Sequence, residues 1–201
     1  MLYNLLRILL GAGILTALLF FLKKRRKWQI RALAIFSALI LYCAICLWPF
    51  ENLFFSFPTP EAAYSYRYKD SIQMIIPGEE SCMIVSDKGE SSFLVKVPNG
   101  WTLENGFFHL NQFVLDQKFS FFVFHHNQIK DDYIILSHLE GNPLDLHDNR
   151  GSSFLFRSKE IPSLGKTYFT YCAAVRNIDS SYTLTIDGEV WPIGEKIAST
   201  S

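Results

Sequence analysis

The sequence predicts a membrane-anchored all-β protein, with an N-terminal two-helix transmembrane hairpin followed by an antiparallel β-sandwich-like domain. Three observations support this prediction. Two apolar stretches, residues 2–22 and 28–48, fill most of the first 50 positions. Five consecutive basic residues separate them, and short apolar runs divided by turn residues fill the rest of the chain.

Charge divides the chain at Phe50. Residues 1–50 contain seven Lys and Arg and no acid, whereas residues 51–201 contain the other 12 basic residues and all 19 acids, which gives formal charges of +7 and −7. This asymmetry is typical of a membrane-proximal segment joined to a water-facing domain. Membrane topology and anionic headgroups account for the basic cluster, so the lipid bilayer is the expected partner and nucleic acid is not.

Each apolar stretch is long enough to cross a bilayer as a helix. Each has 21 residues, and at a rise of ~1.5 Å per residue it spans about 31 Å, the thickness of a hydrocarbon core. Arg7 lies near the end of the first stretch, where its side chain is expected to reach the headgroups. Trp28 and Trp48 bracket the second stretch, and indole rings prefer the membrane interface.

The basic loop 23–27 predicts the orientation of the hairpin. It consists of Lys23, Lys24, Arg25, Arg26 and Lys27. Positive charge in short loops stays on the cytoplasmic side, so the N-terminus and the C-terminal domain are both expected to be extracytoplasmic in a multi-pass cell-membrane protein. A cleaved signal peptide fits poorly, because the basic residues follow the apolar run and no small-residue cleavage site precedes them.

Small residues favour close packing of the two spans. Gly13 and Ala17 in the first span, and Ala34 and Ala38 in the second, have the i,i+4 spacing that lets helix backbones approach each other in lipid. Counted from Arg25 as the hairpin tip, the two pairs lie at similar depths. The same faces could instead recruit another membrane protein.

Residues 51–63 are predicted to form a linker with an aromatic collar. Phe54, Phe55 and Phe57 precede Pro58 and Pro60; aromatic rings favour the interface, and proline stiffens the chain. Thr59 or Glu61 is expected to start a short helical turn.

Residues 64–201 are predicted to form the extracytoplasmic β domain. No window has a sustained helical period, and the lack of crossover helices excludes a parallel α/β fold. The spacing indicates an antiparallel sandwich or a strongly curved sheet pair, with Asp187-Gly188 as a hairpin turn and Asp131-Asp132 as a hairpin tip. The predicted strands are 71–76, 82–85, 92–97, 107–115, 119–125, 133–139, 153–157, 168–175, 182–186 and 189–193.

Aromatic residues crowd the run 119–124. Strand alternation puts Phe119, Phe121 and Val123 on one face and Phe122 and Phe124 on the other. Because both faces are apolar, the run is expected to be a central strand buried in the sandwich. The functional alternative is an exposed aromatic face that binds a partner or touches lipid.

The polar residues give little sign of catalysis, and no cofactor is predicted. Asp145, His147 and Asp148 lie in the richest polar loop and are the candidate metal or hydrolase residues, but they lack the ligand spacing of a standard calcium loop, and Asx turns explain them equally well. Cys82 and Cys172 could form a disulfide in an oxidising compartment, or could be two separately buried thiols.

The segments Phe-Pro-Thr-Pro-Glu-Ala-Ala-Tyr at 57–64, Asp-Asn-x-Gly-Ser-x-Phe at 148–154 and Tyr-Thr-Leu-Thr-Ile-Asp-Gly at 182–188 together have a familiar pattern. The chain resembles uncharacterised small membrane-anchored proteins of Gram-positive bacteria, which have no assigned activity. The resemblance covers residues 57–190 and rests on turns and strands. It implies a bacterial envelope location and transfers no catalytic residue.

Three functions follow as hypotheses. The first is a membrane-tethered extracytoplasmic binding or accessory module for an envelope protein or wall component. The second is an envelope hydrolase with a site near Asp145, His147 and Asp148. The third is a sensor that transmits through loop 23–27, although this loop offers little surface to an effector.

Overall fold

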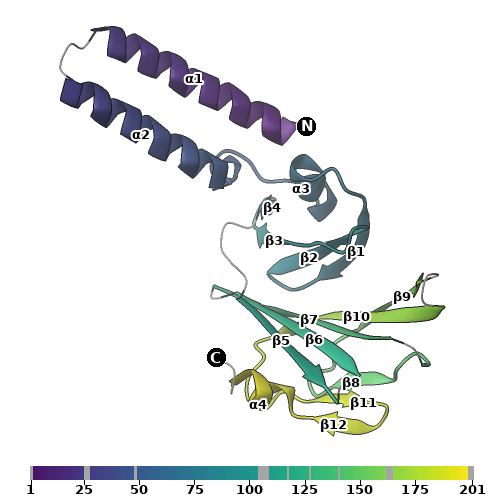
Figure 1. Ribbon diagram of the computed structural model, residues 1–201. Helices are drawn as coiled ribbons and strands as arrows, with labels where there is room; N and C mark the ends of the chain where they lie inside the picture. The colour runs from purple at the N-terminus through teal and green to yellow at the C-terminus, as the bar shows by residue number, and fades with distance from the viewer. Residues whose placement is uncertain are drawn as a thin grey trace.

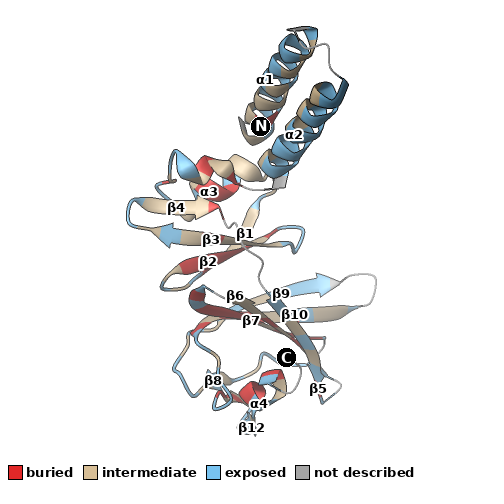
Figure 2. Ribbon diagram, turned by 90° about the vertical axis from the view of Figure 1, so that its left-hand side faces the viewer, coloured by how far each residue is buried: buried red, intermediate tan, exposed pale blue. Residues whose placement is uncertain are grey.

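Two long apolar helices begin the chain, α1 (Leu2–Lys24) and α2 (Trp28–Leu47), and they lie antiparallel (Figure 1). The computed structural model describes residues 2–24, 28–47, 49–103, 109–116, 118–126, 128–139, 141–161 and 165–198. Both helices are long and apolar enough to cross a membrane, judged by length and composition. Most of their side chains are exposed (Figure 2), because each helix packs along one narrow face.

The contact between α1 and α2 uses a different glycine from the predicted one. A Cβ atom added at Gly11 would lie 2.8 Å from Cε2 of Tyr42, whereas one added at Gly13 would have no atom within 4 Å. Ala34 and Ala38 are half-buried, but Gly13 and Ala17 are exposed. Counting from the loop gives the depth of each residue along the hairpin. It does not give the rotation of α1 about its axis, which places Gly11 at the contact.

The chain then turns back onto the start of α1. A short 3₁₀ helix, η1 (Phe50–Leu53), follows α2, and α3 (Pro60–Arg67) follows an extended stretch. The Thr59 side chain accepts a hydrogen bond from the amide of Ala62, which is the N-cap that its sequence position predicts. The predicted linker residues are hydrogen-bonded to the β domain: Phe57 pairs through its backbone with Trp101 at 2.7 Å in both directions.

The first sheet is a four-stranded antiparallel meander in the order β1-β2-β3-β4. Its strands are β1 (Ile72–Pro77), β2 (Ser81–Ser86), β3 (Ser91–Val97) and β4 (Gly100–Leu103). Helix α3 covers one face, where Tyr64 is buried with Cys82, Ile84 and Leu94. The sheet therefore lies between the helical segment and the rest of the β domain (Figure 1).

The second sheet has five antiparallel strands in the order β5-β6-β7-β10-β9. They are β5 (His109–Leu115), β6 (Phe119–His126), β7 (Ile129–Leu139), β9 (Leu155–Ile161) and β10 (Lys166–Arg176). A three-stranded sheet in the order β12-β11-β8 and helix α4 (Ile193–Ala198) pack below it. Its strands are β8 (Leu146–Asp148), β11 (Leu184–Ile186) and β12 (Glu189–Trp191).

The structure confirms two apolar helices followed by antiparallel sheets. Each predicted strand overlaps an observed one, and positions 107 and 108 of the fourth lie outside the described residues. In place of one sandwich there are three sheets. Strands β4 and β8 and helix α4 were not predicted, because segments of three to six residues are too short to show a period. Asp187 (φ 50°) and Gly188 (φ 85°) form the predicted hairpin turn between β11 and β12.

The predicted hairpin tip at Asp131-Asp132 is wrong, since both residues lie inside β7 and are buried. One Asp131 carboxylate oxygen accepts hydrogen bonds from the amides of Glu80 (2.7 Å) and Ser81 (2.8 Å) and from Ser81 Oγ (2.9 Å). The other accepts from the amide of Glu79 at 3.2 Å. The carboxylate therefore binds the β1–β2 turn to the second sheet and sets how the two sheets meet.

Candidate functional site

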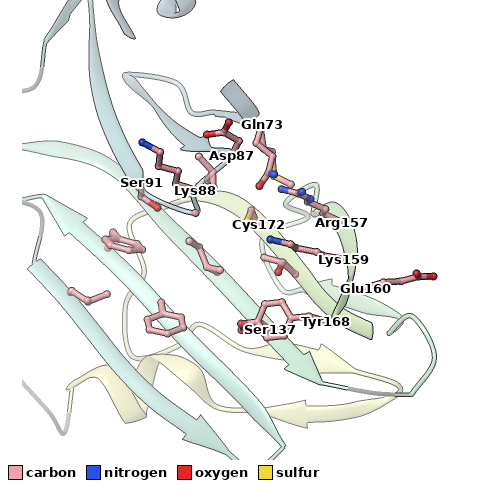
Figure 3. Close-up of a pocket in the computed structure, with 18 residues that line it drawn as sticks. Gln73, Asp87, Lys88, Ser91, Ser137, Arg157, Lys159, Glu160, Tyr168 and Cys172 are labelled. Atoms are coloured by element: carbon pink, nitrogen blue, oxygen red, sulfur yellow. The ribbon is translucent and has the colours of Figure 1, made fainter. Parts of the chain in front are cut away.

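A groove of about 910 Å³ lies between the four-stranded and five-stranded sheets (Figure 3). Its floor is the upper face of the five-stranded sheet, and its roof is the edge of β1, part of β2 and the turn at 87–89. The size is within the range of small-molecule sites, roughly 300–1,000 Å³. The apolar side chains of the lining are Met74, Val85, Leu110, Phe122, Phe124 and Ile135.

Strand alternation explains how one sheet supplies both a core and a groove. On β6, Phe121 and Val123 are buried against the three-stranded sheet, whereas Phe122 and Phe124 are half-buried and line the groove. Phe122 lies opposite Ile135 of β7 in the ladder. The predicted alternation is confirmed: one face of the strand is buried in the core, and the other, with Phe122 and Phe124, is half-buried and lines the groove.

Two of the polar groups on the floor satisfy each other. The Tyr168 hydroxyl donates a hydrogen bond of 2.7 Å to Ser137 Oγ. The Cys172 thiol is buried, and burial raises its pKa to about 12, so it is protonated at neutral pH. A protonated, enclosed thiol is a poor nucleophile and a poor metal ligand. The floor is therefore better suited to binding an apolar ligand than to catalysis or metal binding.

Two cationic side chains lie at one side of the groove. Arg157 and Lys159 lie two residues apart on the same face of β9. They are opposite Thr170 and Tyr168 of β10 in the ladder. Neither forms an ion pair with any residue in the described part of the chain. Figure 3 shows both side chains extending from β9 over the groove, while Glu160, which also belongs to the lining, extends away from them.

The roof contributes no free positive charge. Lys88 also lines the groove, but its Nζ lies 2.6 Å from a carboxylate oxygen of Asp70. Asp87 lies beside it. The free positive charge of the groove therefore comes from β9.

The predicted polar trio does not converge on a site. His147 Nε2 lies 2.8 Å from Asp145, but both side chains are more than 70% exposed. Asp148 instead accepts hydrogen bonds from the amides of Arg150 and Ser152 and from the Tyr182 hydroxyl. It is an Asx cap of its own turn. Among the described residues no group of three His, Cys, Asp or Glu could hold a metal ion.

Cys82 and Cys172 are both free, buried thiols in different clusters of the core. Cys82 packs under α3, and Cys172 packs with Met83 and Tyr133 between the sheets. Burial raises the pKa of the Cys82 thiol, like that of Cys172, to about 12. The structure thus corresponds to the second of the two interpretations, two separate thiols.

Three of the residues predicted to set topology lie at the end of the hairpin far from the sheets, namely Lys23, Lys24 and Trp28 (Figure 1). Lys23 and Trp28 are exposed, and Lys24 is the last residue of α1. Arg25, Arg26, Lys27 and Trp48 lie outside the described residues.

Arg7 differs from its predicted role. It is buried, and its guanidinium lies 3.3 Å from the fully buried Glu51 carboxylate and 4.2 Å from the centre of the Tyr3 ring. The Tyr66 hydroxyl donates to the same carboxylate at 3.5 Å. Burial, and then Glu51, raise the pKa of Tyr66 to about 12, so this hydroxyl keeps its proton. The four residues, here called the junction cluster, join α1 to η1 and α3.

A pair formed by the half-buried His125 and the buried Asp132 was missed from the sequence. His125 Nδ1 lies 2.8 Å from Asp132, whose second oxygen accepts the amide of Ile178 at 2.6 Å. The pair spans the β6–β7 hairpin. It joins this hairpin to the segment after β10, which is a structural task.

The fold and the groove together define a class: two apolar helices joined to layered antiparallel sheets, with an apolar, cation-edged groove between two of them. Comparisons of the chain with known protein families, with curated proteins and with solved structures find no match. The function must therefore be argued from the geometry itself.

The sequence contained part of the signal for this groove. Phe122 and Phe124 are two residues apart and so share one face of their strand, and the same holds for Arg157 and Lys159. These are the two strand faces that line the groove. What the sequence lacked was the pairing of β9 with β10 and the position of the first sheet above them, which bring the two patterns together.

Proposed function

We propose that this protein is a membrane-tethered extracytoplasmic binding module whose ligand occupies the groove between the two sheets. The groove is the observation that supports it most directly. About 910 Å³ of space lined by half-buried aromatic and aliphatic side chains is a costly feature for a domain of this size unless something fills it.

The helical segment supports the tether. Both helices have the length and hydropathy of membrane spans. The antiparallel arrangement brings the N-terminus of α1 and the end of α2 to the same side as the sheets, where the junction cluster joins them. Lys24 at the end of α1 and Trp28 at the start of α2, which flank the basic loop of the sequence, lie at the opposite end of the hairpin. The positive charge of that loop favours the cytoplasmic side for the loop and the extracytoplasmic side for the β domain.

Exposed apolar residues at the junction fit a domain that sits on the membrane surface. Leu53 and Phe54 are 66% and 76% exposed, next to the end of α2. Aromatic rings at this depth prefer the headgroup layer. These side chains would hold the four-stranded sheet close to the bilayer. The groove would then lie on the far side of that sheet, away from the membrane.

Site-specific crosslinking in native membranes tests the proposal. A photoreactive benzophenone amino acid replaces Leu110, which is half-exposed at the groove, or Val190, which is 62% exposed on β12 and does not line it. We expect an adduct of reproducible mass from position 110 that position 190 does not give. If both positions give the same adducts, or only crosslinks to the protein itself, the groove is not a binding site.

A further inference from the structure

The chemistry of the groove points to one class of ligand, an inference that rests on the proposed binding role. We infer that the groove takes up a single anionic lipid molecule, with its alkyl chain on the aromatic floor and its oxyanion head against Arg157 and Lys159. The head is a phosphate or a carboxylate, the two groups that these side chains recognise.

The floor favours an alkyl chain over a peptide. Strands β6, β7 and β10 each have a paired neighbour on both sides, so their backbone amides and carbonyls are already used in the ladders. The polar side chains Ser137 and Tyr168 bind each other. A peptide placed on this floor would find backbone partners only at the edge of β1 in the roof and would bury its other polar groups unpaired, which is costly, whereas an alkyl chain has no such requirement.

The head position follows from the charges. Arg157 and Lys159 are the cationic residues of the lining that have no carboxylate partner among the described residues, since Lys88 is paired with Asp70. A guanidinium presents two parallel N–H donors that match a carboxylate or phosphate, and an ammonium two residues away on the same strand face adds a second charge. An anion beside them would be held at the edge of the apolar floor.

The hairpin gives the source. A chain that is tethered to a bilayer by α1 and α2 meets lipid at high local concentration. The first sheet separates the groove from the helices (Figure 1), so the lipid must leave the bilayer to enter. The groove would thus bind one lipid molecule that has left the bilayer, and it would not itself contact the membrane surface.

The full chain, with the benzophenone residue at position 110, is reconstituted in phosphatidylcholine vesicles that contain hexadecyl phosphate or hexadecanol. We expect a photoadduct with hexadecyl phosphate. The double variant Arg157→Gln/Lys159→Gln should reduce its yield about 10-fold or more, because hydrogen bonds to a charged group are lost. Hexadecanol should give little adduct, and the same amount in both proteins.

The matched control is Lys118→Gln/Lys130→Gln, which removes two exposed positive charges that do not line the groove. It should leave the hexadecyl phosphate adduct unchanged. Equal urea midpoints for both double variants and the parent would show that neither is misfolded. Phe122→Leu serves as a second groove variant and should lower the yield with both probes, because it trims the floor and leaves the charges intact.

Three outcomes would overturn the lipid assignment. One is an equal adduct in Arg157→Gln/Lys159→Gln and its control; another is competition by millimolar inorganic phosphate, which would indicate a site for free anions. The third is a polypeptide adduct from position 110 in native membranes: the binding role would then survive and the lipid would not. Failure of the binding role itself is distinct, because positions 110 and 190 would then behave alike.

Discussion

Asp131 shows how a single side chain fixes the relation between two sheets. Its carboxylate accepts three backbone amides and one hydroxyl from the β1–β2 turn, although it belongs to β7. A Cβ added at Gly78 would lie 2.4 Å from one of its oxygens, so the turn backbone approaches as closely as only glycine allows. The roof and floor of the groove are held together at this point.

Asp131→Asn is expected to destabilise the fold by about 2–4 kcal/mol. The amide keeps one acceptor and turns its NH₂ group toward backbone N–H donors, so charge-assisted hydrogen bonds are lost inside the protein. Urea unfolding measures the change. Asp145→Asn, at an exposed carboxylate, is the matched control and should shift stability by less than about 0.5 kcal/mol. Equal effects of the two substitutions would contradict this role.

The two buried thiols predict a loss of stability at high pH. Their pKa values are raised to about 12 by burial, from an ordinary value of 9.0. Below pH 9.0 both thiols are protonated in the folded and in the unfolded chain, so they take nothing from the stability of the fold. Above it the unfolded chain releases protons that the folded chain retains, so each thiol should cost about 1.4 kcal/mol of stability per pH unit up to the folded pKa.

Urea midpoints between about pH 8 and pH 11 test this slope. The variant Cys82→Ala/Cys172→Ala should be less stable at pH 8, because it leaves small voids, but its stability should fall less steeply as the pH rises. Cys43→Ser/Cys46→Ser, in the hairpin, is the control with the same number of thiols removed. Parallel curves for the parent and the buried-thiol variant would show that the thiols do not titrate as argued.

At the scale of elements, the junction cluster decides how the hairpin meets the sheets. Breaking a buried ion pair from one side typically costs 3–5 kcal/mol, because the remaining charge is left without a partner. Arg7→Leu should therefore release α1 from α3 and η1 and expose segment 54–59 to protease. Arg7→Leu/Glu51→Leu removes both charges and should restore much of the protection. Limited proteolysis distinguishes these outcomes, and equal cleavage of the single and double variants would show that the pair does not hold the junction.

The same cluster shows what sequence reasoning could and could not reach. Length and hydropathy define both helices, and period-two alternation finds each of the longer strands. Arg7 was expected at the headgroups because it was considered within its own span. Its partner lies 44 positions later, and nothing local in the sequence indicates that Glu51 returns to it. Asp131 was misplaced for the same reason, since its partners belong to a turn 50 to 52 positions earlier.

At the scale of the whole molecule, the groove depends on the pairing and packing of strands that are far apart in the sequence. The alternation on β6 and on β9 is local, but the order β5-β6-β7-β10-β9 places a strand from late in the chain beside one from the middle. Such pairing is set by the final packing of all elements together. This is why the residues of the polar loop, which are close in sequence, drew attention, while Phe124 and Arg157, which are 33 positions apart, line one cavity.

Orientation in the membrane is the property of the whole chain that the basic loop should control. If the positive-inside rule applies, a cysteine introduced at the exposed Ser180 should react with a membrane-impermeant maleimide in intact cells. The reporter is placed in Cys43→Ser/Cys46→Ser/Cys82→Ala/Cys172→Ala so that it is the single thiol.

Replacing residues 23–27 by five Gln should reduce labelling several-fold, because the loop then loses its preference for the cytoplasm. As a control, Lys118→Gln/Lys130→Gln removes basic residues of the β domain and should not change the labelling. Labelling that occurs only after the cells are permeabilised would place the β domain in the cytoplasm, and the groove would then face a different set of ligands.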